Sequence, residues 1–383
     1  MILATATVSW GATWHVAQDG SGDFTVIQAA IDAASPGDEI RIHAGRYEEV
    51  TEGWDVWGNN TVIAHVHLAI TKDNLTIIGD GPEQTIIGFE ELPDSFPNNY
   101  IGISVTTTHA NTLTLRNLAL ENIRYGIYAA SQSIEVTGCR FDHMQVEGIR
   151  TFTPEGALVD DCSFVNCAAV VSLYPTRNLV VSNSVIAMTA GAPLMTGVVC
   201  IDSENVSVES CTITGGGGAI DYQQGTTGEI RNVVAYGFNT YGIKLALGAY
   251  ATVTDCHIEG GLKAVISEGA GILCTGSSFI GQTYRTLELN SDGDSVFNDC
   301  TIINGGGWSV YCFYNGSGDC HLDVTNNNWG TDSEAQIAEW IHDSDDDSQI
   351  CCTADFIPFN GPVATEAHSW SEVKGLFRGE RDD

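Results

Sequence analysis

From residue 112 onward, short apolar segments and polar turns alternate with a period of about 22 residues. Each period contains an apolar strand, a polar turn residue, a small residue and, two positions later, another apolar residue, as in V-T-G-C-R-F, V-E-S-C-T-I and F-N-D-C-T-I. A second strand then follows, as in G-I-Y, G-I-R and G-I-K. So short a period excludes a two-helix repeat and is typical of a β-solenoid.

Two columns of equivalent residues support this interpretation. The small residues of successive periods are Leu118, Cys139, Cys162, Ser184, Cys211, Val233, Cys256, Ser278, Cys300 and Asn328. The position before each of them holds a turn residue, and the position two residues later is apolar. We therefore predict an all-β protein, a right-handed parallel β-helix of about a dozen coils that stack at ~4.8 Å.

The cysteines follow the same column. Five of the 12 Cys occupy the small inward position, which predicts buried thiols rather than a disulfide framework: Cys139, Cys162, Cys211, Cys256 and Cys300. Four others cluster near the C-terminal end, where an exported protein could form one or two bridges: Cys312, Cys320, Cys351 and Cys352.

An open stack of strands needs a cover at both ends. Thr25 is positioned to cap a helix over residues 25–34, and Ser333 to cap one over 333–342. We expect these helices to close a single domain over residues 15–361. Residues 1–14 read either as a first strand or as the remnant of a secretory signal cleaved near Ala12, and residues 362–383 as a tail.

Alternation along the second strand predicts two outward columns on one sheet. The first contains Tyr128, Arg150, Ser172, Asp221, Lys244, Ile266, Glu288 and Tyr311. The second contains Ala130, Phe152, Tyr174, Gln223, Ala246, Glu268, Asn290 and Phe313. Because aromatic rings stack on sugars and polar groups bond to hydroxyls, the carbohydrate-binding candidates are Tyr128, Phe152, Tyr174 and Gln223.

Charged residues of the first column are the catalytic candidates: Asp221, Lys244, Arg150 and Glu288. A hydrolase needs two carboxylates about 5–10 Å apart, whereas Asp221 and Glu288 are expected about 14 Å apart along the stack. A lyase needs a base and a cation beside a uronate. The alternative for Asp221 and Lys244 is an opposite-charge pair between strands of a solvated sheet.

The charge balance restricts the partners. Asp and Glu number 49 against 15 Lys and Arg, a formal net charge of −34, which excludes nucleic acid as a ligand. It also disfavours polyuronates and favours a neutral glycan, unless a divalent cation bridges the two. Asp343, Asp345 and Asp347 are candidate Ca²⁺ ligands, and the alternative is a solvated acidic loop. No apolar stretch of about 18 residues predicts a membrane span.

Residues 16–34 (V-A-Q-D-G-S-G-D-F-T-V-I-Q-A-A-I-D-A-A) and the G-x-Y-x-E match at Gly45, Tyr47 and Glu49 resemble the start of pectin methylesterases. The coil pattern resembles the pectin lyase-like superfamily. The N-N-N-W-G-T segment (326–331) resembles the end of secreted bacterial β-helix proteins. The resemblance implies a right-handed β-helix that a bacterium exports or displays on its surface.

The catalytic motifs of pectin methylesterases are missing. Gly281-Gln282-Thr283 lacks the Asp of Q-D-T, no Arg precedes a Pro, and Asp355-Phe356-Ile357 falls after the predicted C-terminal helix. Pectin methylesterase activity is therefore not expected. Two function classes remain open. The absence of catalytic motifs favours a secreted or cell-surface carbohydrate-binding or structural rod without catalysis, and the alternative is a polysaccharide-active lyase or hydrolase.

Overall fold

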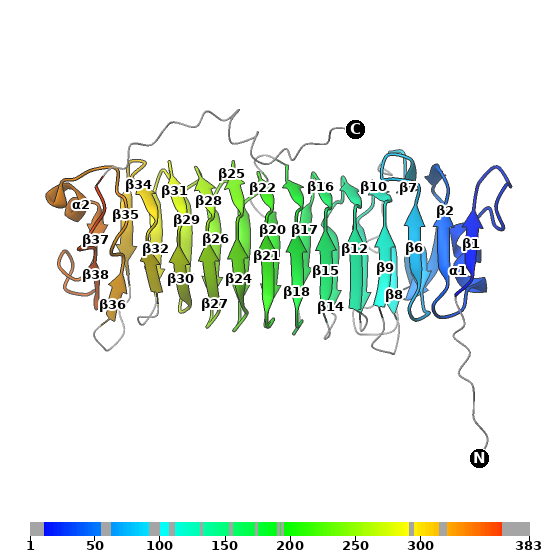
Figure 1. The fold of residues 1–383 in the computed structure, drawn as a ribbon, viewed down its shortest axis with the longest axis horizontal. Helices are drawn as coiled ribbons and strands as arrows, with labels where there is room; N and C mark the ends of the chain where they lie inside the picture. The colour runs from blue at the N-terminus through cyan, green and yellow to red at the C-terminus, as the bar shows by residue number, and fades with distance from the viewer. Residues whose placement is uncertain are drawn as a thin grey trace, which may run out of the picture.

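Apolar residues on one face of each short strand stack on their counterparts in the neighbouring coils. Ile127, Ile149 and Val170 are aligned in successive strands and are fully buried. The computed structural model describes residues 11–54, 63–91, 100–106, 112–130, 133–152, 156–172, 175–189, 192, 195–290, 295–313 and 320–361. These residues wind into an elongated parallel β-helix of about 11 turns, with about 23 residues per turn (Figure 1). The predicted fold is confirmed.

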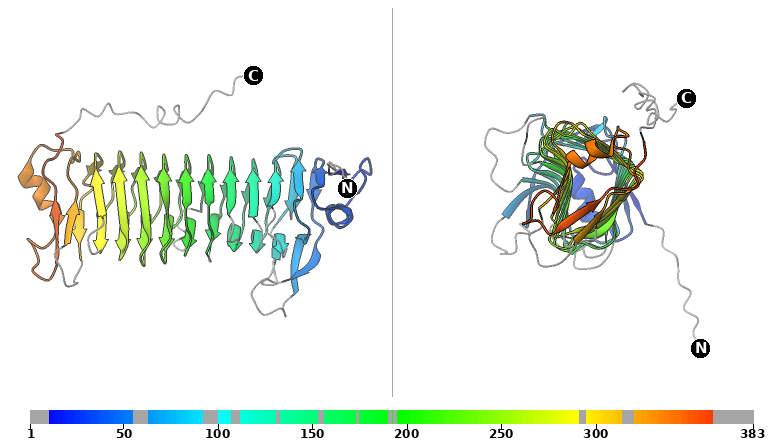
Figure 2. Two further views of the ribbon diagram at one scale, coloured as in Figure 1. Left: turned by 60° about the horizontal axis from the view of Figure 1, so that its bottom comes forward. Right: turned by 90° about the vertical axis from the view of Figure 1, so that its left-hand side faces the viewer.

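Each coil adds one strand to each of three sheets, which surround one continuous core (Figure 2). Sheet A contains β1 (Thr13–Val16), β2 (Glu39–Ile42), β6 (Thr76–Gly79), β9 (Thr112–Arg116), β12 (Ser133–Thr137), β15 (Ala157–Asp160), β18 (Leu179–Ser182), β21 (Val206–Glu209), β24 (Thr227–Arg231), β27 (Tyr250–Thr254), β30 (Gly271–Thr275), β33 (Ser295–Asn298), β36 (Cys320–Asp323) and β38 (Cys352–Asp355). Sheet B contains β3 (Gly45–Tyr47), β7 (Thr85–Gly88), β10 (Ala119–Glu121), β13 (Arg140–Asp142), β16 (Ser163–Val165), β19 (Val185–Ala187), β22 (Thr212–Thr214), β25 (Val234–Tyr236), β28 (His257–Glu259), β31 (Ser278–Ile280) and β34 (Thr301–Ile303).

Sheet C carries the predicted outward columns. It contains β4 (Thr51–Trp54), β5 (Ile63–Ile70), β8 (Tyr100–Thr106), β11 (Tyr125–Ala130), β14 (Glu147–Phe152), β17 (Ala168–Ser172), β20 (Thr196–Ile201), β23 (Gly218–Gln223), β26 (Tyr241–Ala246), β29 (Lys263–Glu268), β32 (Arg285–Asn290), β35 (Trp308–Cys312) and β37 (Ile341–His342). Among the described strands, β4 and β5 form the antiparallel pair of this sheet, and the other pairs are parallel.

The turn from sheet A to sheet B uses one left-handed residue per coil. The φ angles there lie between 49° and 63°, values that Asn, Asp and Gly tolerate best. These residues are Asn117, Gly138, Asp161, Asn183, Ser210, Asn232, Asp255, Gly276, Asp299 and Asn326. Gly276 and Asn326 adopt the left-handed turn conformation, so Ser277 and Asn327 occupy the small inward position. The predicted inward residues Ser278 and Asn328 are therefore wrong by one residue.

The polar residues of the inward column accept hydrogen bonds from backbone N–H groups of the preceding coil. The hydroxyl groups of Ser184 and Ser277 each accept a hydrogen bond at 3.1 Å from the N–H of the cysteine in the preceding coil, Cys162 and Cys256 respectively. The Asn327 side chain accepts one from Cys300 in the same way, at 2.8 Å. A small polar residue thus satisfies a buried N–H group without widening the core.

Short helices cover both ends of the stack (Figure 1). The helix predicted over residues 25–34 is α1 (Ile27–Ala33), and its N-cap is Val26, without a side-chain bond. Thr25 is not the cap, because the helix begins too late for its hydroxyl to reach the first turn.

The helix predicted over residues 333–342 is α2 (Glu334–Glu339), and Ser333 caps it at 3.3 Å. It ends early because Ile341 and His342 pair with β35 as strand β37. Among the described residues, neither helix is long and apolar enough to span a membrane. Residues 1–10 and 362–383, which include most of the predicted signal remnant and the tail, lie outside the described part.

The five cysteines of the inward column are buried thiols, as predicted. Burial raises the pKa of Cys139 and of Cys256 to about 12. Near the C-terminal end, Cys352 is disulfide-bonded, and its partner in the strand register is Cys320. Cys312 is a buried free thiol.

Candidate functional site

The strand register defines the first outward column of sheet C. It runs through Tyr128, Arg150, Val171, Val199, Asp221, Lys244, Ile266, Glu288, Tyr311 and His342. Val171 replaces the predicted Ser172, which is fully buried, and Val199 adds a coil that the prediction lacked. The segment A-A-V-V-S offers two adjacent valines, and only pairing with β14 determines which of them faces inward.

The two predicted aromatic contacts that the structure describes differ in exposure. Tyr128 is only 2% exposed and packs on half-buried Phe152 with 5.0 Å between ring centroids. Arg150 lies beside them, and two of its nitrogens donate to the Glu147 carboxylate at 2.5 and 2.6 Å. Arg150 is therefore committed to an ion pair. Tyr174, the third predicted aromatic contact, lies outside the described residues.

Asp221 lies at the centre of the face and is 6% exposed. Its Oδ2 accepts hydrogen bonds from Gln223 at 2.8 Å and from the Tyr241 hydroxyl at 3.3 Å. Its Oδ1 is buried and has no hydrogen-bond partner. Burial is the main cause that raises the pKa of Asp221, opposed by Gln223 and by the charge of Lys244. Gln223, a predicted sugar contact, thus also holds a candidate acid.

Lys244 is next to Asp221 in the register, as predicted, but its ion pair is with another carboxylate. The Lys244 Nζ lies 3.2 Å from Glu268 Oε2, and the two side chains are 26% and 44% exposed. Glu268 contributes to the raised pKa of Asp221, so the two negative charges affect each other. We call Asp221, Tyr241, Lys244 and Glu268 the polar centre.

Glu288 belongs to a different group, three strands from Asp221 in the register. It is 5% exposed and accepts hydrogen bonds from Lys263 at 2.7 Å and Arg285 at 2.6 Å. Two cations therefore bind this carboxylate, one at each oxygen. Both oxygens are engaged in these ion pairs and are not available to a reacting group. Glu288 serves to fix Arg285.

Aromatic rings surround Arg285 on the outward side. Its guanidinium carbon lies 3.4 Å from the ring centroid of Tyr311 and 4.4 Å from that of Tyr284. Tyr311 also stacks on His342 at 4.9 Å, and His342 lies 5.1 Å from the ring of Trp308. We call these four rings, Tyr284, Trp308, Tyr311 and His342, the aromatic platform.

Tyr284 is 43% exposed and Trp308 is 38% exposed, so the platform offers ring surface to solvent. Sequence analysis placed Tyr311 outward but missed Trp308, Arg285 and Lys263. These three residues occupy the first position of their strands and form one register column. Strict alternation counted back from the inward residues Val265, Leu287 and Val310 would place this column inward, so alternation alone could not have found it.

The predicted calcium ligands serve a turn. Asp343 is 5% exposed, and its two oxygens accept hydrogen bonds from the backbone N–H groups of Asp345 at 2.9 Å and Ala354 at 2.8 Å. Asp347 accepts one from Gln349 at 2.9 Å. Within the described ranges, no group of three His, Cys, Asp or Glu residues could hold a metal ion. The structure gives the Ca²⁺ hypothesis no support.

Comparison with solved structures places this fold among known β-helices. The chain is similar to the catalytic unit of a thermostable GH87 alpha-1,3-glucanase from Streptomyces thermodiastaticus, with 15% identity and a TM-score of 0.56, over 82% of this chain and 69% of that one. It is also similar to the Agl-KA catalytic domain, with 16% identity and a TM-score of 0.50, over 85% of this chain and 59% of that one. Such low identities establish the fold alone.

None of the curated proteins matches the sequence of this chain. A family model described as right handed beta helix region matches residues 101–197 and 196–340, more than half of the chain. The three-sheet architecture, the turn residues and this match agree. The chain therefore belongs to the right-handed β-helix family, with a pectin lyase-like fold.

Proposed function

We propose that this protein binds a neutral polysaccharide along the outward face of sheet C, with the aromatic platform as the main contact surface. The observation that carries the proposal is the exposed ring surface of Trp308 and Tyr284 beside Arg285. Flat aromatic rings pack on the apolar faces of sugar rings. Polar side chains beside the aromatic rings remain free to form hydrogen bonds with the sugar hydroxyls. A protein with a net charge of −34 repels an anionic polymer, so the ligand is neutral.

The contact surface is held rigidly before any ligand arrives. Tyr311 and Trp308 belong to β35, and Arg285 is fixed between them and Glu288 in β32. Rings that do not need to be ordered on binding keep more of their interaction energy as affinity. The platform and Asp221 lie on the same face, four coils apart between Asp221 and Tyr311, or about 19 Å. That length suits a polymer rather than a single sugar.

We propose that the protein is secreted or held at the cell surface, where the structural polysaccharides of cell walls and matrices occur. The catalytic unit of an alpha-1,3-glucanase has a similar fold, which supports a glycan as the ligand class. The β-helix is long enough to contact several consecutive sugar residues. Many weak contacts along the polysaccharide together then provide the affinity.

Trp308→Ala is the variant that tests the binding proposal. A glycan array and affinity electrophoresis against neutral glucans are expected to show at least a tenfold loss of affinity. Tyr250→Ala is the matched control, because Tyr250 is 41% exposed but lies on sheet A. Equal affinity of wild type and Trp308→Ala, with the fold intact by circular dichroism, would overturn the proposal. Adding Ca²⁺ tests whether a cation extends binding to anionic glycans.

The polar centre favours glycoside hydrolysis as a second candidate function. Asp221 combines a raised pKa with an unbonded, buried Oδ1, which are properties of a general acid that protonates a leaving oxygen. Glu268, two coils further on, is the accessible carboxylate that could activate water. Two coils correspond to roughly 10 Å along the stack, close to the spacing of inverting carboxylate pairs.

Hydrolysis is tested by the release of new reducing ends from neutral glucans. In an active protein, Asp221→Asn is expected to lower the rate at least a hundredfold while glycan affinity stays unchanged. Glu229→Gln, an exposed carboxylate on sheet A, is the control. If wild type releases no reducing ends from any polymer that it binds, the hydrolysis candidate is rejected and the binding proposal stands alone.

A further inference from the structure

Two histidines and an aspartate meet on the outward side of sheet A, at the N-terminal end of the stack. His15 belongs to β1, His43 follows the last residue of β2, and Asp80 follows the last residue of β6. These three strands are neighbours in sheet A (Figure 1). Val16 and Ile42, which are next to the histidines along the chain, are fully buried. Alternation therefore directs both histidine side chains outward.

The two histidine rings face each other. His15 Nδ1 lies 3.1 Å from His43 Nε2, and the rings are stacked with 5.3 Å between their centroids. On the other side of its ring, His43 Nδ1 lies 3.2 Å from Asp80 Oδ2. An ionised carboxylate can only accept, so Nδ1 carries the proton when the His43 ring is neutral. The Nε2 atom of His43 therefore presents its lone pair toward His15.

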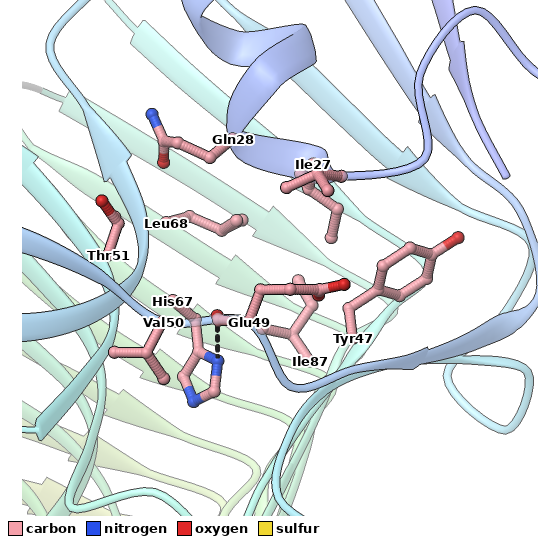
Figure 3. Close-up of a pocket in the computed structure, with 10 residues that line it drawn as sticks. Ile27, Gln28, Tyr47, Glu49, Val50, Thr51, His67, Leu68 and Ile87 are labelled. Carbon is pink, nitrogen blue, oxygen red and sulfur yellow. Dashed lines mark hydrogen bonds between the residues drawn. The ribbon is translucent and has the colours of Figure 1, made fainter. Parts of the chain in front are cut away.

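The surrounding backbone holds this pair in place. The N–H group of His43 donates to the carbonyl oxygen of Val16 at 2.9 Å, and the Tyr47 hydroxyl donates to the carbonyl oxygen of His43 at 3.0 Å. Tyr47 is buried and lines a pocket beside α1, with its hydroxyl directed away from the other labelled residues of that pocket (Figure 3). Asp80 is also fixed, because its Oδ2 accepts the N–H of Ala44 at 3.0 Å.

The histidine pair is accessible to a cation from solvent. The His43 side chain is 42% exposed, and His15 is half-buried. Asp23 accepts the backbone N–H of His15 at 3.0 Å, which places another carboxylate beside this residue. Arg41, the register partner of His15, is paired with Glu39 at 2.7 Å. The positive charge next to the pair is therefore balanced by a neighbouring acid.

The spacing of the two ring nitrogens suits a metal ion. Two imidazole nitrogens that bind one ion at about 2.0–2.1 Å, with an angle of about 90–110° between them, lie about 2.9–3.4 Å apart. The 3.1 Å between His15 Nδ1 and His43 Nε2 falls within this range. Asp80 completes the arrangement that orients metal-binding histidines, in which the nitrogen remote from the metal donates to a carboxylate. Within the described part of the chain, no third histidine, cysteine or carboxylate joins the pair as a ligand, so water would fill the remaining positions.

We propose that His15 Nδ1 and His43 Nε2 together bind a divalent transition-metal ion, and that Cu²⁺ binds most tightly because it has the highest affinity of these ions for nitrogen ligands. The ion replaces the hydrogen bond between the two nitrogens. The His15 proton moves from Nδ1 to Nε2, so both rings bind as neutral ligands and nothing is oxidised or reduced. The site is independent of the proposed glycan-binding face, because it lies on sheet A at the N-terminal end of the stack.

The test titrates Cu²⁺ into the full chain labelled with ¹⁵N-histidine, followed by calorimetry and by electron paramagnetic resonance. One tightly bound ion per chain is expected, with hyperfine coupling to two histidine nitrogens. A hundredfold excess of Mg²⁺, which prefers oxygen ligands, should not displace the Cu²⁺. A spectrum with fewer than two histidine nitrogens, or displacement by Mg²⁺, would overturn the proposal.

Three variants assign the binding to these residues. His15→Gln and His43→Gln are each expected to weaken Cu²⁺ binding at least tenfold. Asp80→Ala should weaken it about tenfold, at the lower end of the range for carboxylates that orient a metal-binding histidine. His257→Gln is the matched control, because His257 also lies beside a carboxylate, but its other ring nitrogen faces a hydroxyl group rather than a second histidine. Unchanged affinity in any of the three folded variants, or an equal loss in the control, would contradict the assignment.

Discussion

The guanidinium carbon of Arg285 lies 3.4 Å from the ring centroid of Tyr311 in the next strand. On its other side, Arg285 donates to Glu288 at 2.6 Å, and Lys263 shares that carboxylate. A planar cation is therefore held between rings and a buried anion. This arrangement keeps the aromatic platform in place without covering Trp308.

Arg285→Lys keeps the charge but loses the planar stacking group. We expect a loss of about 1 kcal/mol in the free energy of unfolding, within the range of cation–π contacts, and weaker glycan binding. Urea unfolding followed by tryptophan fluorescence measures the first effect. Arg177→Lys is the control, because its ion pair with Glu204 is 69% and 67% exposed and should change stability little. Equal losses in both variants would show that the stacking contributes nothing.

Asp221→Asn should change the pH dependence of stability. Because the pKa of Asp221 is raised in the folded state, folding favours its protonated form, and its contribution is present at low pH and lost as pH rises above about 4. The Asn variant, which cannot ionise, should therefore melt at a higher temperature than wild type at pH 7. The difference should shrink toward pH 3.5. A difference that grows as pH falls would contradict the raised pKa.

Tyr222 is fully buried, and its hydroxyl has no hydrogen-bond partner. Burying an unsatisfied hydroxyl is unfavourable, so removing it without changing the ring should be neutral or stabilising. Tyr222→Phe is expected to keep or raise the melting temperature. Phe141→Leu, a substitution in the same core, should lower it, because it removes part of a stacked ring pair. A clear destabilisation by Tyr222→Phe would reveal a partner for the hydroxyl.

Gly126→Ala tests the close packing around a glycine of β11 in sheet C. The added Cβ would lie 2.4 Å from the carbonyl oxygen of Gly148 and 2.9 Å from the ring of Phe141, so the backbone must shift. We expect a destabilisation of about 1–3 kcal/mol, as in other overpacked cores. Gly361→Ala, where no atom lies within 4 Å, should have almost no effect. Thermal unfolding compares the two.

The inward cysteines should be unreactive in the native protein. Cys211, Cys256 and Cys300 are at most 2% exposed. Burial also raises the pKa of Cys256 to about 12 and that of Cys211 to about 11, so their thiolates are scarce at pH 8. A hydrogen bond from Cys274 lowers the pKa of Cys300, so this thiol is protected by its burial alone. A thiol reagent followed by mass spectrometry should label all three only after unfolding in urea. Rapid labelling of native protein would show that the coils open locally.

Much of this fold follows from the sequence, because a β-helix repeats the same local requirements in each coil. The inward positions need apolar or small residues, and the turn needs a residue that tolerates positive φ. Both columns can therefore be recognised in the amino-acid sequence. The two misplaced turns, at Ser277 and Asn327, arose where several small polar residues are adjacent and the spacing fits two alignments. Only backbone hydrogen bonding between coils distinguishes them.

The candidate site shows the limit of the same reasoning. Sequence alternation found Asp221, Lys244 and Gln223 on one face, because side-chain direction alternates along any strand. It could not show that Tyr128 is buried, that Arg150 is paired with Glu147, or that Lys244 pairs with Glu268. The burial of Tyr128 and the pairing of Lys244 with Glu268 depend on neighbouring coils. Glu147 and Arg150 pair within β14, three residues apart, which strict alternation does not predict.

The sequence by itself therefore determined the coil, its period and the chemistry of each column. The tertiary structure decided which charges are paired and which rings are exposed. The physical reason is that period and side-chain direction are properties of a single strand. Exposure, many of the ion pairs and the pKa of Asp221 depend also on residues about 20 or more positions away, which the stacking of coils brings within a few ångströms.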